Sequence, residues 1–183
     1  MGYLKYFKKN WNSTNEENKK RITEWRREPA TLRIFRPTRI DRARNAGYKA
    51  KKGFFVIRQR AIRGGRQRPD IKGGRRSSRS SQRKNVAKNY QAVCEERVTR
   101  KYPNCEVLNS YYVGHDGKYI WYEVILVERD NPSVYLTKET AWALDTRNKS
   151  LRGLTSANKK SRGLRKKGIG SEKTRPSKRA NKK

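Results

Sequence analysis

The residue types that most often carry out catalysis are few and widely spaced in this sequence. Cys94 and Cys105 have no second cysteine pair beside them, and the chain has one histidine, His115. Because a structural zinc site needs four ligands, usually in two close pairs, this pattern excludes the usual zinc frameworks. Both thiols are expected to be buried and reduced. His115 precedes Asp116 in an expected turn and has no base partner, so it is expected to be an exposed turn residue.

Two further patterns that can carry chemistry lack the partners they need. Glu95 and Glu96 are adjacent on an expected helix, where we interpret them as its polar face and as neighbours of nearby arginines. The glycine pairs at 64–65 and 73–74 are not followed by the Lys-Ser/Thr that ends a nucleotide-binding loop. We expect these glycines to let the backbone approach a phosphate chain closely. The sequence therefore predicts no enzyme, no cofactor and no metal site.

Basic residues dominate the rest of the sequence. The formal net charge is +33 on 183 residues, from 49 Lys+Arg against 16 Asp+Glu. Residues 33–84 hold 19 basic and 2 acidic side chains, and residues 147–183 hold 15 and 1, whereas residues 85–146 hold 7 and 9. A near-neutral piece between two cationic segments that are poor in apolar residues is typical of a small fold embedded in nucleic acid.

Arginine outnumbers lysine in the first cationic segment, with 14 arginines among its 19 basic residues. The guanidinium group binds phosphate through two parallel hydrogen bonds and stacks on bases, whereas lysine is a point charge. The segment therefore favours recognition of folded nucleic acid over a merely solubilising surface, which would repel itself without a counter-charge. For the chain beyond Arg152, a solvated anchor without a specific site is the alternative.

The distribution of apolar and basic residues divides the chain into four parts. Residues 1–30 should form two helices, the first with Tyr3, Phe7 and Trp11 on one face. Residues 31–52 read as an irregular basic segment ordered by phosphate contacts. Residues 53–146 should form an α+β core interrupted by a basic loop at 64–82, and residues 147–183 a basic extension. No apolar run approaches the roughly 18 residues of a membrane span, so we expect an intracellular soluble protein.

Within the core, the pattern predicts a strand over 53–63 and an amphipathic helix from Val86 that Pro103 ends. Two aromatic and β-branched runs, 105–113 and 118–128, flank an Asp-Gly turn and predict a hairpin. A short apolar patch after residue 132 either closes the sheet or forms helical turns. The expected fold class is α+β: a small, mainly antiparallel sheet with helices, a helical N-terminus and long irregular basic extensions.

Aromatic side chains on the predicted hairpin have two possible uses. Tyr111, Tyr112, Trp121 and Tyr122 could form a platform on which bases stack. Paired strands bury one face in any case, so packing in the core or against a partner protein is favoured. Tyr48 stands alone among lysines and arginines and is the better candidate for stacking on a base.

Three long runs of the sequence carry a resemblance to a known family. They are RPTRIDRARNAGYKAKKGFFVIRQRAIRGGRQRPDIKGG, AVCEERVTRKYPNCEVLNSYYVGHDGKYIWYEVILVE and RGLTSANKKSRGL. Together they resemble the archaeal and eukaryotic L15e family of large-subunit ribosomal proteins, from Gly2 to about Gly168, and the short chain looks archaeal. The tail after Gly168 has no clear counterpart. The resemblance implies a cytoplasmic ribosomal protein with a small α+β domain and extended basic arms on large-subunit ribosomal RNA.

The predicted RNA-binding residues follow from the arginine distribution and from this resemblance. They are Arg33, Arg36, Arg39, Arg42, Arg44, Tyr48, Lys49, Lys51, Lys52, Arg58, Arg60, Arg63, Arg66, Arg68, Lys72, Arg75, Arg76, Arg79, Arg152, Lys159, Lys160, Arg162 and Arg165. The expected partners are large-subunit ribosomal RNA and neighbouring ribosomal proteins, without a membrane or a small-molecule substrate.

Two other classes of function stay open from the sequence. A chromatin-like protein that binds double-stranded DNA would also place basic arms around a small fold, and preference for duplex DNA in competition binding would identify it. An RNA-modifying enzyme could use Cys94 or His115, and function retained after Cys94→Ser and His115→Ala would exclude it.

Overall fold

A four-stranded antiparallel sheet forms the centre of the molecule. The computed structural model describes residues 2–13, 15–65, 73–74, 88–165 and 169. The strands run in the spatial order β1-β2-β4-β3, and their bounds are Thr31–Ile34, Phe54–Ile62, Cys105–His115 and Tyr119–Glu128 for β1, β2, β3 and β4. This sheet, with helices and a helical N-terminus, confirms the expected α+β class.

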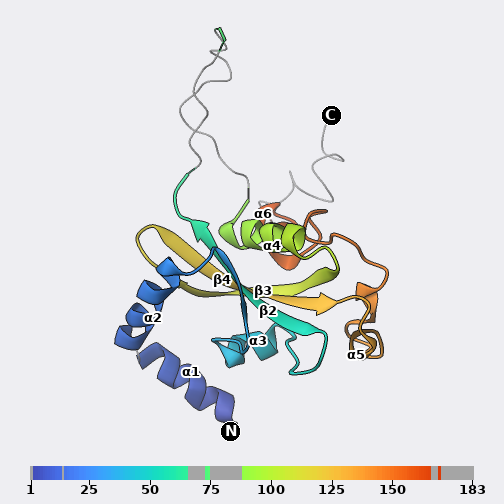
Figure 1. Ribbon diagram of the computed structural model, residues 1–183, viewed down its shortest axis with the longest axis horizontal. Helices are drawn as coiled ribbons and strands as arrows, with labels where there is room; N and C mark the ends of the chain where they lie inside the picture. The colour runs from blue at the N-terminus through green and yellow to red at the C-terminus, as the bar shows by residue number, and fades with distance from the viewer. Residues whose placement is uncertain (1, 14, 66–72, 75–87, 166–168, 170–183) are drawn as a thin grey trace.

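Helices cover both faces of the sheet (Figure 1). One face carries α1 (Tyr3–Ser13), α2 (Asn15–Arg27) and α3 (Ile40–Asn45), and the opposite face carries α4 (Tyr90–Lys101) with α6 (Ser156–Ser161) outside it. The short α5 (Pro132–Tyr135) and the 3-10 turn η2 (Ala141–Ala143) lie beside the end of β4. Within the described residues, no helix combines the length and the apolar content that crossing a bilayer requires.

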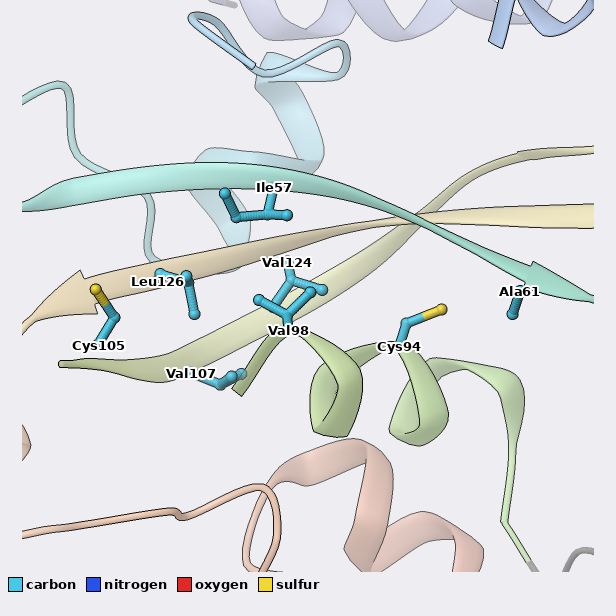
Figure 2. Packing of buried hydrophobic residues seen from close by; sticks show 8 residues of the cluster. All are labelled: Ile57, Ala61, Cys94, Val98, Cys105, Val107, Val124 and Leu126. Atoms are coloured by element: carbon cyan, nitrogen blue, oxygen red, sulfur yellow. The ribbon is translucent and has the colours of Figure 1, made fainter. Parts of the chain in front are cut away.

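Alternating strand residues build a core on each side of the sheet. Ile57 and Val124 point to the α4 face, where Cys94 and Val98 of α4 meet them (Figure 2). Their strand neighbours on the other face pack around Trp25 of α2. The two cysteines are free and buried, as predicted.

The hairpin prediction is confirmed, and its turn is held by one carboxylate. The Asp116 side chain accepts hydrogen bonds from the backbone N–H of Lys118, at 2.7 Å, and of Tyr119. The predicted helix of the core is α4, which begins at Tyr90 behind an Asn89 cap, whose side chain accepts from the N–H of Ala92 at 2.7 Å. Val86, where the helix was predicted to begin, and most of the predicted basic loop at 64–82 lie outside the described residues. The apolar patch after residue 132 forms the helical turns α5 and η2.

The expectation of an irregular segment over residues 31–52 is wrong, because β1 and α3 lie within it. β1 pairs antiparallel with β2, Thr31 opposite Gln59 and Ile34 opposite Val56. That pairing joins residues far apart in the chain, so local periodicity carries no trace of it. The α3 helix has six residues, of which Asp41 and Ala43 face inward, too few to produce a detectable apolar stripe. The α6 helix in the C-terminal extension escaped prediction for the same reason.

Gly53 closes the turn that leads into β2, and a substitution there should be costly. Its φ is +85°, and an added Cβ would lie 2.7 Å from Val134 Cγ2. The left-handed backbone costs an L-residue about 1–2 kcal/mol and overpacking adds about 1–3 kcal/mol, so Gly53→Ala should lower the unfolding free energy by about 2–5 kcal/mol. Gly117 provides the control, because a Cβ added there would meet no heavy atom within 4 Å beyond its chain neighbours. In urea denaturation Gly117→Ala should stay within about 1 kcal/mol of wild type, and equal losses in both variants would contradict this account.

Candidate nucleic-acid interface

Exposed cations lie on both faces of the molecule. We call residues 31–52 the first arm and residues 147–165 the second arm. Arg42 and Arg44 project from α3 of the first arm, and Lys159 and Lys160 from α6 of the second; all four are exposed. Figure 1 shows α3 and α6 on opposite faces of the sheet, so these exposed cations of the two arms belong to opposite sides of the molecule.

The predicted RNA-binding residues that the structure describes fall into three groups by exposure, and six more lie outside the described residues. Arg33, Arg36, Arg42, Arg44, Lys51, Lys52, Arg63, Arg152, Lys159, Lys160, Arg162 and Arg165 are exposed. Tyr48, Lys49 and Arg60 are half-buried, and Arg39 and Arg58 are buried. Arg66, Arg68, Lys72, Arg75, Arg76 and Arg79 lie outside the described residues.

The two buried arginines are paired inside the protein. Arg39 donates to Asp41 at 3.0 Å, and its guanidinium lies 5.1 Å from the ring centroid of Trp11. Arg58 donates to Glu28 at 2.5 Å and lies 4.3 Å from the Trp25 ring centroid. Arg58 of β2 therefore joins α2, which carries Trp25, to the sheet, and Arg39 joins α1, which carries Trp11, to the start of α3. Their positive charge is directed inward.

The half-buried members of the set also have protein partners. Lys49 forms an ion pair with Glu139 at 2.8 Å. Arg60 donates to the carbonyl oxygen of Arg26 at 2.7 Å and lies 4.5 Å from the Tyr119 ring centroid. Tyr48 packs against two of the apolar clusters. Part of the Tyr48 ring is therefore covered by the core, which reduces the area on which a base could stack.

Most of the negative charge near the sheet is buried. Asp41, Glu95, Glu96, Glu106 and Glu123 are all less than 9% exposed. Four of these five belong to residues 85–146, the segment whose sequence charge is close to neutral. Since its lysines and arginines are mostly exposed, the surface of this segment is more cationic than its composition suggests. The molecule therefore presents positive charge outward from the core as well as from the arms.

Glu123 fastens the first arm to the sheet. This β4 carboxylate is fully buried and accepts hydrogen bonds from the Thr38 N–H at 3.1 Å and from the Thr38 hydroxyl. The Tyr111 hydroxyl donates to it at 2.5 Å, and burial raises the pKa of Tyr111. Thr38 lies just before α3, so this contact fixes where Arg42 and Arg44 project.

Two further carboxylates fasten the second arm. Glu106 of β3 accepts from the backbone N–H of Asn148 at 2.6 Å and of Lys149 at 3.1 Å. Glu95 of α4 accepts at 2.5 Å from the hydroxyls of Ser110 and of Thr155, the residue that caps α6. These carboxylates hold the arm that carries the α6 lysines at two points, and Asn89 adds a third by donating to Ser161 Oγ and to the carbonyl oxygen of Ala157.

The expectation that Glu95 and Glu96 form a polar helix face beside arginines is wrong. Glu95 faces the sheet and the second arm, and Glu96 pairs with Lys88 at 2.7 Å. The partners of Glu95 lie 15 and 60 positions away in the chain, so helix spacing alone could not reveal them. The one sequence signal that indicated burial of Glu95 is its position among the apolar residues of the helix.

Burial raises the pKa of Glu95, against the hydrogen bonds from Ser110 and Thr155 that lower it. The raised pKa means that the folded protein holds this proton more tightly than the unfolded chain, whose value is near 4.5. Its stabilising contribution is therefore complete below that value and declines as pH rises through the folded-state pKa. We predict that Glu95→Gln flattens the fall in unfolding free energy above pH 4.5, measured by urea denaturation at successive pH values. A pH profile parallel to wild type would contradict this prediction.

The hairpin aromatics are mostly part of the core, as favoured. Tyr111 and Trp121 are buried and Tyr122 is half-buried, whereas Tyr112 is exposed. The Tyr112 hydroxyl bonds Nδ1 of His115, which is exposed as predicted. A continuous base-stacking platform is therefore absent from this hairpin. Among the described residues, histidine, cysteine and acidic side chains form no group of three that could hold a metal ion.

Comparison with known proteins gives consistent results over nearly the whole chain. A family model described as Ribosomal L15 matches residues 2–181. This range includes the tail after Gly168, so the expectation that the tail has no counterpart in the family is wrong.

Three archaeal relatives are named large ribosomal subunit protein eL15. The protein of Methanocorpusculum labreanum is 53% identical over 158 residues, which cover 86% of this chain and 81% of the relative. That of Picrophilus torridus is 52% identical over 166 residues, covering 89% and 85%. That of Methanospirillum hungatei is 52% identical over 164 residues, covering 88% and 84%.

Proposed function

The chain belongs to the Ribosomal L15 family, and on this basis we propose that it is a structural constituent of the large ribosomal subunit. In this role it binds and stabilises folded large-subunit ribosomal RNA through the exposed arginines and lysines of its two arms. Its place is the cytoplasmic ribosome, the ribonucleoprotein that carries out translation, beside other large-subunit proteins.

The observation that carries the proposal is the placement of charge. Cations of the arms project from opposite faces of the sheet, and buried Glu95, Glu106 and Glu123 hold those arms in position. RNA phosphates on both faces would replace the counterions at the arginines and lysines of the arms. The sheet would then fix the distance between an RNA segment on one face and an RNA segment on the other. The protein acts here as a rigid spacer between polyanions, without turnover.

Chemistry at the cysteines is not part of this proposal. A thiol reacts as the thiolate, and burial raises the pKa of Cys94 to about 12 and that of Cys105 to about 11. Both thiols are therefore protonated at neutral pH. Cys94→Ser and His115→Ala should leave RNA binding unchanged, which a binding isotherm on each variant measures.

Competition binding tests the proposal against the duplex-DNA alternative. Full-length protein bound to labelled large-subunit ribosomal RNA is challenged with unlabelled copies of that RNA or with duplex DNA of equal phosphate content. We expect the ribosomal RNA to compete at least about tenfold better, because arginine forks on two faces fit phosphates arranged in a folded shape. Equal or better competition by duplex DNA would reject the proposal.

A further inference from the structure

An open groove of about 630 Å³ lies where β1 ends, β2 begins and β4 ends. Its lining includes Arg33 of β1 with Phe35 and Arg36 just after it, and Tyr48, Lys51 and Lys52 from the chain before β2. The rest of the lining includes Phe54 and Phe55 at the start of β2 and Glu128 at the end of β4. Phe35, Arg36, Lys51 and Lys52 are exposed, so the groove is open to a ligand that approaches from solvent.

Phe35 is the unusual member of this lining. It follows the last paired residue of β1, Ile34, and its side chain is 91% exposed. Burial of an aromatic ring is favourable, and Phe35 takes almost none of that gain within the chain. Most of the ring surface is therefore open to solvent and to a planar partner.

The cations around Phe35 indicate the charge of that partner. Arg36 lies 5.8 Å from the Phe35 ring centroid, and the Arg33 guanidinium is stacked 4.3 Å from the centroid of Phe55. Arg36, Lys51 and Lys52 are exposed, and among the residues that the structure describes no carboxylate forms an ion pair with them. A groove with an exposed aromatic ring and several unpaired cations is complementary to a planar group that carries negative charge.

A carboxylate in the same groove indicates which part of such a ligand lies beside it. Glu128 of β4 lines the groove and accepts a hydrogen bond from Asn131 at 3.2 Å. It would repel a phosphate at its own position, but it can accept hydrogen bonds from the N–H groups of a base edge. An apolar peptide segment would cover Phe35 but leave the cations without a partner, whereas a nucleotide offers a base to the ring and phosphates to the cations.

We infer that this groove binds one unpaired nucleotide of ribosomal RNA, with its base stacked on Phe35 and its adjoining phosphates held by Arg36, Lys51 and Lys52. The inference rests on the proposed function and deepens it, since it names an unpaired base as a ligand. Stacking on an aromatic side chain is the usual way in which proteins hold unpaired bases, and it tolerates different base identities.

The test compares two RNA probes on the full-length protein. One is a single-stranded oligonucleotide of mixed sequence, and the other is a fully paired RNA duplex with the same number of phosphates. Phe35→Ala should weaken binding of the single strand about 5- to 100-fold and change duplex binding less than about twofold, because the duplex offers no free base face. Phe35→Trp should bind the single strand about as tightly as wild type, because it keeps an aromatic ring. Leu136→Ala, at a side chain that is 79% exposed elsewhere, is the matched control and should change neither.

The salt dependence separates this inference from the proposed function. Stacking releases no counterions, so Phe35→Ala should leave the slope of log affinity against log salt unchanged, whereas Lys51→Ala with Lys52→Ala should make it shallower. Unchanged single-strand affinity in Phe35→Ala, or equal losses of affinity for both probes, would overturn the inference that the groove binds a nucleotide. Salt-dependent binding of wild type to ribosomal RNA would in that case still support the proposed function. Failure of wild type to bind ribosomal RNA would reject both.

Discussion

Binding of the full-length protein to large-subunit ribosomal RNA should weaken about 1,000- to 100,000-fold between about 50 and 200 mM salt. A protein that neutralises roughly 6–10 phosphates loses affinity on that scale, because the released counterions must be bound again as salt rises. The exposed cations of the two arms are sufficient in number for such contacts. Fluorescence anisotropy on labelled RNA at a series of KCl concentrations measures the slope directly.

Variants of the second arm assign part of that slope to particular residues. Replacing Lys159, Lys160 and Arg162 together with alanine should make the slope shallower by about 2–3 units, close to one unit for each lost phosphate contact. A matched control replaces three basic residues outside both arms, namely Lys101, Lys118 and Lys138. The control should change the slope by less than about one unit. Equal changes in the two triple variants would show that the arms are not the principal contact.

Loss of the Glu123 carboxylate should produce the largest change in stability. Glu123→Ala leaves a cavity in the sheet and removes the acceptor of the Thr38 N–H and of the Thr38 and Tyr111 hydroxyls. The expected loss is about 3–5 kcal/mol of unfolding free energy, because each buried unsatisfied donor costs about 1–3 kcal/mol and the cavity adds to it. Urea denaturation followed by circular dichroism measures this change.

Two further variants make that result specific. Glu123→Gln keeps an acceptor and most of the volume, so it should lose less than half as much as Glu123→Ala. Glu139→Ala removes an exposed carboxylate paired with Lys49 and should leave the denaturation midpoint close to wild type. If Glu123→Ala were as stable as Glu139→Ala, the buried carboxylate would not hold the first arm.

The elements that could be predicted from the sequence are those whose signals are local. The 3.6-residue period of α4, the Asp-Gly turn between β3 and β4 and the apolar start of β2 each reside within a dozen neighbouring residues. The same holds for the buried, free state of the cysteines, which follows from their spacing and surroundings. The family resemblance was recognisable because it rests on long ordered runs.

The features that escaped prediction depend on contacts between distant parts of the chain. β1 exists because it pairs with β2, and Arg58 turns inward because Glu28 and Trp25 of another segment meet it. Glu95 and Glu123 face inward for partners 60 and 85 residues away. Arg58 was predicted to face RNA and Glu95 to lie on the polar face of its helix, since composition cannot distinguish a charged group that faces solvent or RNA from one that is paired inside the protein.

Lysine footprinting on the assembled complex tests most directly whether the anchored arms are what contacts RNA. Full-length protein, alone and bound to large-subunit ribosomal RNA, is treated briefly with an amine-acetylating reagent, and each lysine is quantified by mass spectrometry. We predict strong protection of Lys51, Lys52, Lys159 and Lys160 in the complex, with Lys118 and Lys138 still reactive. Protection confined to Lys118 and Lys138, or equal protection at all six lysines, would contradict it.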